Sequence, residues 1–206
     1  YRRFLEEILR TKEHSLSEEK EELLARVSEL GRAPSNIYGM FNNADITFQP
    51  VKDENGNEQP LTQERYVHYL ENKNREIRKE AFTNLYSGYK GFANTIAAVF
   101  DANVRQAAFF AKERKYSSSL EAALDGGNIP ISVYTNLIRT VEEHQQPMQR
   151  YLELRKRLLG VEQLHMYDVY VPMIEKTEKK YSFEEAKHMV LNALSVLGSE
   201  YTACLR

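Results

Sequence analysis

One long run of helical periodicity, residues 75–116, constrains the fold more than any other feature of the sequence. Its apolar residues recur every three or four positions, which keeps them on one face of an α-helix and excludes a β-strand. At about 1.5 Å per residue, a continuous helix of about 42 residues would be about 60 Å long. Four further aromatic residues widen the apolar face, so we predict the central helix of a lobe with several packing partners. The face consists of Ile77, Ala81, Leu85, Tyr89, Phe92, Ile96, Phe100, Val104, Ala107 and Ala111, widened by Phe82, Tyr86, Phe109 and Phe110.

Two glycines are the weak points of this helix. Gly88 and Gly91 each cost about 1 kcal/mol relative to alanine in a helix interior. They mark either sites where another element packs closely or the place where the helix bends. We favour close packing, and a bend stays open.

Helix-capping patterns predict further helices before the central one. Residues 1–43 are predicted to form a helical hairpin region, whose second helix begins near Ser17 and ends at Gly31. Residues 63–124 form the region of the long central helix, which follows a short helix capped by Thr62.

The remaining helices are predicted within residues 128–206. Pro147 interrupts the first of them, so we expect a kink or a new start near Gln145. Ser182 and Glu185 form a capping box that opens the last helix.

Two short segments depart from helical periodicity. Residues 44–62 contain an Asn-Gly turn at Asn55 and Gly56, the signal of a small β-hairpin. Residues 164–174 alternate with a period of two, which indicates an extended segment. The predicted fold class for residues 1–206 is therefore mainly α: a multi-helix lobe around one long helix, with a small β-hairpin and a short extended segment.

Charge and composition exclude several classes of function. The formal net charge of −2 gives no field that would gather nucleic acid or an anionic membrane. No window approaches about 18 consecutive apolar residues, so no membrane span is expected. Cys204 is the only cysteine, so no intramolecular disulfide can form and a cytoplasmic location is the default.

The search for catalytic motifs is negative. None of the 5 histidines belongs to a His-Glu-x-x-His zinc motif, and no glycine-rich phosphate loop occurs. We therefore predict no catalytic and no metal-binding residue in this chain. Only residues 164–172 are dense in functional side chains. They form either an edge strand with local side-chain pairs or a strand that lines a ligand cleft.

Several stretches are similar to the oligoendopeptidase F group of zinc metallopeptidases, relatives of thimet oligopeptidase. They occur in the order of that family and cover nearly the whole chain. In the family, the zinc-binding His-Glu-x-x-His helix and the third ligand, a glutamate, lie downstream of the matched region, so this chain resembles an internal portion. The matching stretches are Ala33-Pro34-Ser35-Asn36-Ile37, Asn42-Asn43-Ala44-Asp45, Arg78-Lys79-Glu80-Ala81-Phe82, Ala111-Lys112-Glu113-Arg114-Lys115-Tyr116, Ser119-Leu120-Glu121-Ala122-Ala123-Leu124, Asn128-Ile129-Pro130, Tyr151-Leu152-Glu153-Leu154-Arg155-Lys156 and residues 164–172.

The resemblance implies a cytoplasmic enzyme that hydrolyses internal bonds of short peptides. Two histidines and a glutamate of the parent protein would hold zinc, and a second glutamate would act as general base on the zinc-bound water. This portion would bind no zinc and would be inactive alone. It would form channel wall, and its partners would be short peptide substrates and the remaining catalytic lobe of the same chain. Within it, Tyr167 and Asp168 are predicted to bind substrate or to face the zinc-bearing helix.

A different class of function stays open: a stand-alone helical protein-interaction module without catalysis. It would be favoured if the natural chain ended near Arg206 and its apolar faces formed a partner surface. A third alternative is the lobe of a pseudoenzyme whose zinc motif has decayed. The sequence starts at Tyr1 instead of Met and runs directly into a helical pattern, so we expect a piece of a longer protein.

Overall fold

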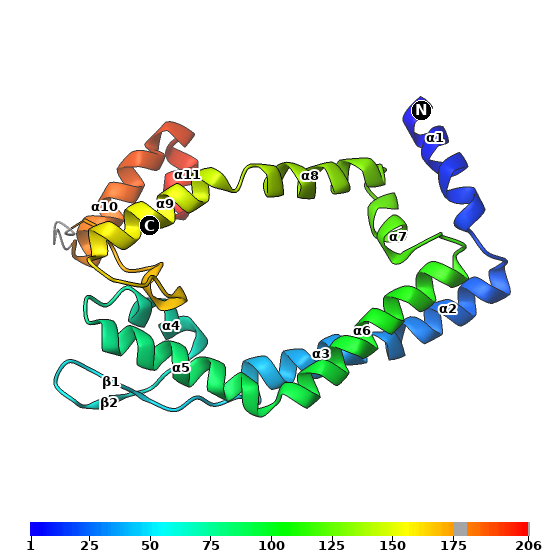
Figure 1. Ribbon diagram of the computed structural model, residues 1–206. Helices are drawn as coiled ribbons and strands as arrows, with labels where there is room; N and C mark the ends of the chain where they lie inside the picture. Colours follow the sequence, from blue (N-terminus) through cyan, green and yellow to red (C-terminus); the bar gives the residue numbers. More distant parts are fainter. Residues whose placement is uncertain (175–180, 206) are drawn as a thin grey trace. The chain divides into compact units, whose positions relative to one another are not determined.

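The computed structural model of the chain describes residues 1–174 and 181–205. Contacts divide the chain into two units, Tyr1–Val171 and Pro172–Arg206, and each unit is described by itself. Unit 1 contains helices α1 to α9 and the only strands found among the described residues, and unit 2 contains α10 and α11 (Figure 1). The predicted fold class, mainly α with a small β-hairpin, is confirmed.

The first helices of unit 1 do not form the hairpin predicted for residues 1–43. They are α1 (Arg2–Thr11), the 3-10 helix η1 (Lys12–His14), α2 (Glu18–Gly31), α3 (Ala33–Met40) and the single π turn η2 (Phe41–Asp45). The bounds of α2 agree with the prediction, but no residue of α1 is buried. Instead, Arg10 forms an ion pair with Asp125, and the His14 ring stacks on Tyr116 with centroids 3.6 Å apart. Polar and ring contacts with a later segment therefore hold this end of the chain.

The β-hairpin predicted within residues 44–62 is present. Its antiparallel strands are β1 (Val51–Lys52) and β2 (Glu58–Gln59), with Val51 opposite Gln59 and Lys52 opposite Glu58. Gly56 has a φ of +83°, a left-handed conformation that glycine adopts without strain. The Asp53 carboxylate accepts hydrogen bonds from the backbone N–H groups of Asn55 and Asn57, both at 2.9 Å, and so fixes the turn.

The long central helix is divided into two helices. The helices of this region are α4 (Gln63–Leu70), α5 (Arg75–Gly91) and α6 (Ala93–Glu113). Phe92 separates α5 from α6 with φ −111° and ψ 18°, so the predicted long helix is broken there, beside Gly91, where the sequence left a bend open (Figure 1). A Cβ at Gly88 would lie 2.7 Å from the Phe48 ring, so another segment packs closely there, as predicted. Nothing lies within 4 Å of a Cβ at Gly91, which precedes the break.

Three helices and one 3-10 turn complete unit 1. They are α7 (Ser119–Asp125), α8 (Ile131–Glu143), α9 (Gln146–Leu159) and η3 (Met166–Asp168). Because α9 starts anew with Pro147 in its first turn, the interruption predicted near Gln145 is confirmed. The strand expected within residues 164–174 is wrong: this described segment contains η3 and no strand. Its carbonyl oxygens accept hydrogen bonds from arginine side chains, whereas in a sheet they would accept them from the backbone N–H groups of a neighbouring strand.

Unit 2 contains two α-helices joined by a 3-10 helix. They are α10 (Phe183–Ala193), η4 (Leu194–Leu197) and α11 (Ser199–Cys204). The predicted capping box is confirmed, because Ser182 Oγ accepts a hydrogen bond from the Glu185 N–H at 3.2 Å and the Glu185 carboxylate accepts one from the Ser182 N–H at 2.7 Å. No described residue of unit 2 is buried.

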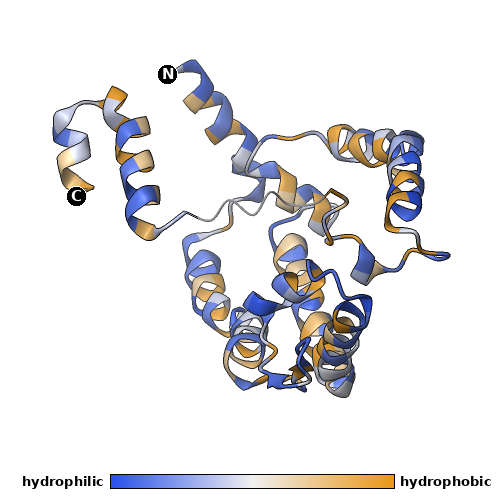
Figure 2. Cartoon of the chain, turned by 90° about the vertical axis from the view of Figure 1, so that its left-hand side faces the viewer, coloured by the Kyte–Doolittle hydropathy of each residue, from blue (hydrophilic) through white to orange (hydrophobic). Residues whose placement is uncertain are grey.

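The hydrophobic core of unit 1 lies between the β-hairpin, α4 and α5. It consists of Val51, Leu61, Tyr69, Ile77, Ala81 and Leu85. Figure 2 shows hydrophobic residues on helices well beyond this core. Every residue of α8 is exposed, for example, and Leu137 and Val141 keep 62% and 59% of their surface accessible. None of the described helices is long and apolar enough to cross a lipid bilayer.

Candidate functional site

Asp168, at the end of η3, is the most deeply buried charged residue among those the structure describes. Its carboxylate accepts hydrogen bonds from Arg75 at 3.1 and 2.9 Å, from Arg78 at 2.8 Å and from the His165 backbone N–H at 3.0 Å. Both arginines lie in the first turn of α5, three residues apart and therefore on one side of the helix. The Asn74 side chain caps this turn. The first turn of α5 therefore places two guanidinium groups where both can bind one carboxylate.

A third arginine binds the backbone of the same segment. Arg155 of α9 donates from Nε to the Asp168 carbonyl oxygen at 2.9 Å and from Nη2 to the Val171 carbonyl oxygen. We call Arg75, Arg78 and Arg155 the arginine cluster. Because it takes members from α5 and α9, the cluster fixes η3 to two helices that are far apart in sequence.

The Tyr167 ring is enclosed by this arrangement. It stacks on His165 with centroids 5.0 Å apart and meets the Phe82 ring edge-on at 5.8 Å. The guanidinium carbon of Arg75 lies 5.4 Å from the ring centroid, within the range of a cation–π contact. Arg78 donates to the Tyr167 carbonyl oxygen at 3.2 Å. Only 8% of the surface of Tyr167 remains accessible.

The arginine cluster determines the ionisation of Asp168. Burial by itself raises the pKa of this carboxyl group, but hydrogen bonds from Arg75, Arg78 and the His165 amide outweigh it and lower the pKa to about 2. Conversely, the hydrogen bond to Asp168 raises the pKa of Arg75. The pair therefore stays charged under all physiological conditions.

The lowered pKa predicts an acid-dependent loss of stability. Because the folded-state pKa of Asp168 is below the unfolded value of about 3.9, its contribution is complete above about pH 4 and is lost as the pH falls toward 2. A shift of this size corresponds to about 2 kcal/mol. We expect the destabilisation caused by Asp168→Asn, measured by urea unfolding, to shrink by about that amount between pH 6 and pH 2. Other carboxylates titrate equally in both proteins. A destabilisation by Asp168→Asn that does not change with pH would contradict the lowered pKa of Asp168.

The arrangement positions a backbone segment and offers no reactive group. No buried side-chain donor or acceptor among the described residues lacks a hydrogen-bond partner. No three His, Cys, Asp or Glu side chains in the described part of the chain lie close enough together to hold a metal ion. The residues present therefore do not fit a zinc site, and we assign no catalytic group within them.

The structure brings the two residues predicted from the sequence, Tyr167 and Asp168, into one turn. Their direct contact with substrate stays a prediction, which the burial of both side chains does not favour. The three arginines are not predicted as site residues, although each stands at a position in the sequence that is unusual for an arginine. Arg75 and Arg78 lie in the first turn of a helix, where the helix dipole disfavours positive charge, and Arg155 interrupts the apolar stripe of α9.

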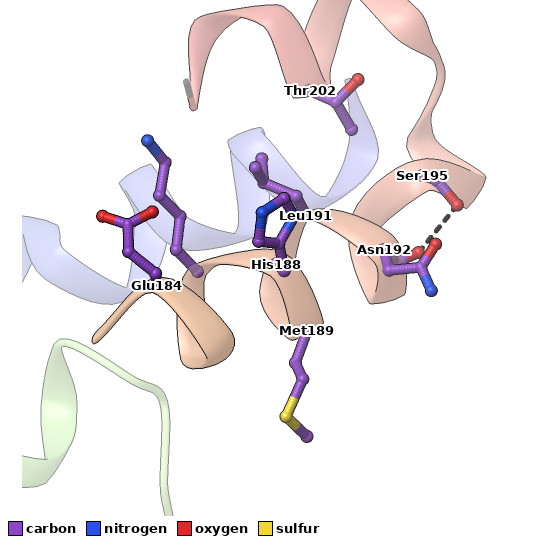
Figure 3. Close-up of a pocket in the computed structure, with 8 residues that line it drawn as sticks. Glu184, His188, Met189, Leu191, Asn192, Ser195 and Thr202 are labelled. Atoms are coloured by element: carbon purple, nitrogen blue, oxygen red, sulfur yellow. Dashed lines mark hydrogen bonds between the residues drawn. The ribbon is translucent and has the colours of Figure 1, made fainter. Parts of the chain in front are cut away.

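A second candidate is a groove of about 640 Å³ in unit 2 (Figure 3). Glu184 and His188 project from one side of α10, and Met189 points away from them. The hydroxyl groups of Ser195 and Thr202 donate to backbone carbonyls of their own preceding turns at 2.7 and 3.2 Å. Glu184 and His188 have no third ligand in the described part of the unit. We therefore assign no chemistry to this groove.

Two family profiles match the chain. The profile described as Oligopeptidase F matches residues 1–48. The profile described as Peptidase family M3 matches residues 68–197, which is more than half of the chain. The chain therefore belongs to peptidase family M3.

Individual relatives agree with this assignment. The oligopeptidase PepF of Bacillus subtilis is 41% identical over 206 residues, which cover 100% of this chain and 31% of the relative. The oligoendopeptidase F homolog of Borreliella burgdorferi is 40% identical over 202 residues, covering 98% and 33%. The crystal structure of oligoendopeptidase-F from Enterococcus faecium has a TM-score of 0.82 at 41% identity and covers 100% of this chain and 38% of that chain. The chain spans about one third of the length of the curated relatives.

Proposed function

We propose that this chain is the channel-wall portion of a zinc metalloendopeptidase that hydrolyses internal bonds of short peptides. The observation that carries this proposal is the match to peptidase family M3, together with relatives that are named oligopeptidase or oligoendopeptidase and are about three times as long. The enzyme acts in the cytoplasm. The only cysteine, Cys204, fits that setting because it forms no disulfide.

The remaining catalytic lobe of the same chain is the proposed partner of the exposed helices. Along α8 and α9, Val133, Leu137, Met148 and Leu158 keep between 55% and 62% of their surface accessible. Apolar stripes of this length on a protein surface mark interaction sites. The apolar faces of α8 and α9 are therefore suited to form an interface with a further part of the protein.

The zinc belongs to that remaining lobe. The described residues include no group of His, Cys, Asp or Glu that could hold a metal ion. We expect this portion alone to be inactive, and its proposed contribution to the enzyme is the shape and lining of the channel.

In this proposal, Tyr167 and Asp168 support the side of the channel wall that faces the substrate. Because both side chains are buried against the arginine cluster, they act by fixing residues 169–171 and not through free side-chain groups. Tyr170, in that segment, keeps 53% of its surface accessible. Kinetics of the full-length enzyme with Asp168→Asn and Tyr167→Phe test this role, and unchanged turnover with unchanged stability would exclude it.

The enzyme itself is tested on the native protein captured from its source with an antibody to this chain. Mass spectrometry is expected to give about three times the 24.0 kDa of the chain, with a His-Glu-x-x-His peptide beyond Arg206. The captured protein should cleave an internally quenched peptide, and a zinc chelator should abolish cleavage. The 206-residue chain expressed alone is the matched control and should be inactive. A native mass near 24 kDa without peptidase activity would favour the helical interaction module instead.

A further inference from the structure

A row of aromatic side chains continues from the arginine cluster along α5. Arg78, Phe82 and Tyr86 are four residues apart, so they lie on one face of the helix. The Phe82 ring lies 4.5 Å from the Tyr86 ring and 5.8 Å from the Tyr167 ring, centroid to centroid. The row is therefore continuous with the fixed turn η3, and Tyr86 at its end keeps 52% of its surface accessible.

Two further tyrosines lie on or next to segments that pack against α5. Tyr66 of α4 packs against the hydrophobic core and is half-buried, and Tyr170 follows η3 and is exposed. Both α4 and η3 pack on α5, which brings these segments to the same helix. Burial, with smaller contributions from the phenols of Tyr86 and Tyr170, raises the pKa of Tyr66 to about 12. Tyr66, Tyr86 and Tyr170 form the tyrosine cluster.

The hydroxyl groups of this cluster are free within the described residues. No hydrogen bond joins the hydroxyl of Tyr66, Tyr86 or Tyr170 to another described group, whereas the Tyr69 hydroxyl donates to the Pro60 carbonyl at 3.1 Å and the Tyr116 hydroxyl donates to Asp125 at 2.8 Å. Three phenols with unused donors and acceptors thus come from three separate segments. The hydroxyls of Tyr89 and Tyr151 likewise have side-chain partners.

We propose that Tyr66, Tyr86 and Tyr170 bind the backbone of a peptide substrate, an inference that rests on the proposed function. A phenol hydroxyl can both donate to a peptide carbonyl and accept from a peptide N–H, so it recognises the backbone whatever the sequence. The rings add apolar contact with little loss of side-chain entropy. The arginine cluster fixes the turn that carries Tyr170, and the core fixes Tyr66, so the site is organised before the substrate arrives.

The test uses the full-length protein and Tyr→Phe changes at positions 66, 86 and 170, which remove only the hydroxyl groups. Each single change is expected to raise KM for an internally quenched peptide about three- to tenfold, the effect of one lost hydrogen bond. The triple variant should raise KM further, with kcat nearly unchanged, because these groups bind parts of the peptide that do not react. Tyr134→Phe is the matched control, since Tyr134 is 41% exposed on α8 and away from the cluster.

Equilibrium binding of the same peptide to chelator-treated protein separates this proposal from the proposed function. If the unmodified protein hydrolyses the peptide but the triple variant keeps its KM, the tyrosine cluster does not bind substrate and the enzyme assignment stands. If no hydrolysis occurs but the triple variant binds the peptide several-fold more weakly than wild type and Tyr134→Phe, the cluster is a peptide site on a protein without catalysis. A lower Tm of the triple variant with unchanged KM and Kd would overturn the proposal, because the hydroxyls then bind another part of the protein.

Discussion

Replacing Asp168 with asparagine is expected to destabilise the chain by about 3 kcal/mol or more, the usual effect of removing one partner of a buried ion pair. The Asp168 side chain is 0% exposed, and Arg78 remains 4% exposed with its charge. The amide of asparagine places donor hydrogens where the carboxylate accepts from Arg75 and His165, so at least one donor there loses its acceptor. Urea unfolding at pH 7, followed by far-UV circular dichroism, measures this loss.

Asp101→Asn is the matched control for this change. Asp101 accepts from Arg105 at 2.7 Å, a distance like those around Asp168, but both side chains are largely exposed. Exposed pairs one helical turn apart contribute little to stability, so the free energy of unfolding should be nearly unchanged. Equal effects of the two substitutions would show that the arginine cluster is not the support of η3.

The positions of most helices could be predicted because their boundaries are encoded locally. Thr62 and Ser182 accept hydrogen bonds from backbone N–H groups in the first turns of α4 and α10, as their sequence patterns predict. Pro147 lacks an N–H group, so it can stand only where no hydrogen bond to a preceding turn is needed, and α9 begins there. Such signals depend on neighbours a few residues away.

The misassigned elements depend on contacts that the local pattern does not contain. The apolar repeat continues through Phe92 although α5 ends at Gly91. Beyond the break, Phe100 and Val104 of this repeat keep 69% and 49% of their surface accessible. The two-residue alternation at residues 164–174 does not produce a strand, because carbonyl and carboxylate groups of this segment accept hydrogen bonds from arginines and not from a neighbouring strand. Arg75 lies 93 residues before Asp168, so its role depends on the tertiary fold.

The candidate site could be predicted only as a density of functional groups. The tyrosine and aspartate of residues 164–172 are identified, but the sequence does not show which side chains are buried. Tyr170 is exposed and its neighbours at 167 and 168 are not. The buried pair supports the turn, and its direct contact with substrate stays a prediction.

Leu70→Ala is expected to cost about 2–5 kcal/mol, the range for truncating a large side chain in a packed core. Leu70 ends α4 with 1% of its surface accessible, and α4 packs along α5. The resulting cavity would also loosen the helix that carries Tyr66, so KM for peptides should rise in the full-length protein. Urea unfolding of the 206-residue chain measures the first effect, and peptide kinetics measure the second.

Leu137→Ala on α8 makes the same chemical change at a side chain that is 62% exposed. In the 206-residue chain this substitution should change the free energy of unfolding by less than about 1 kcal/mol, because little apolar surface is lost from a core. In the full-length protein the same substitution should be costly, because the proposed catalytic lobe then covers α8, whereas the Leu70→Ala penalty should be similar in both. A small Leu137→Ala effect in both proteins would mean that α8 faces solvent in the complete molecule, and the catalytic lobe would have to dock elsewhere.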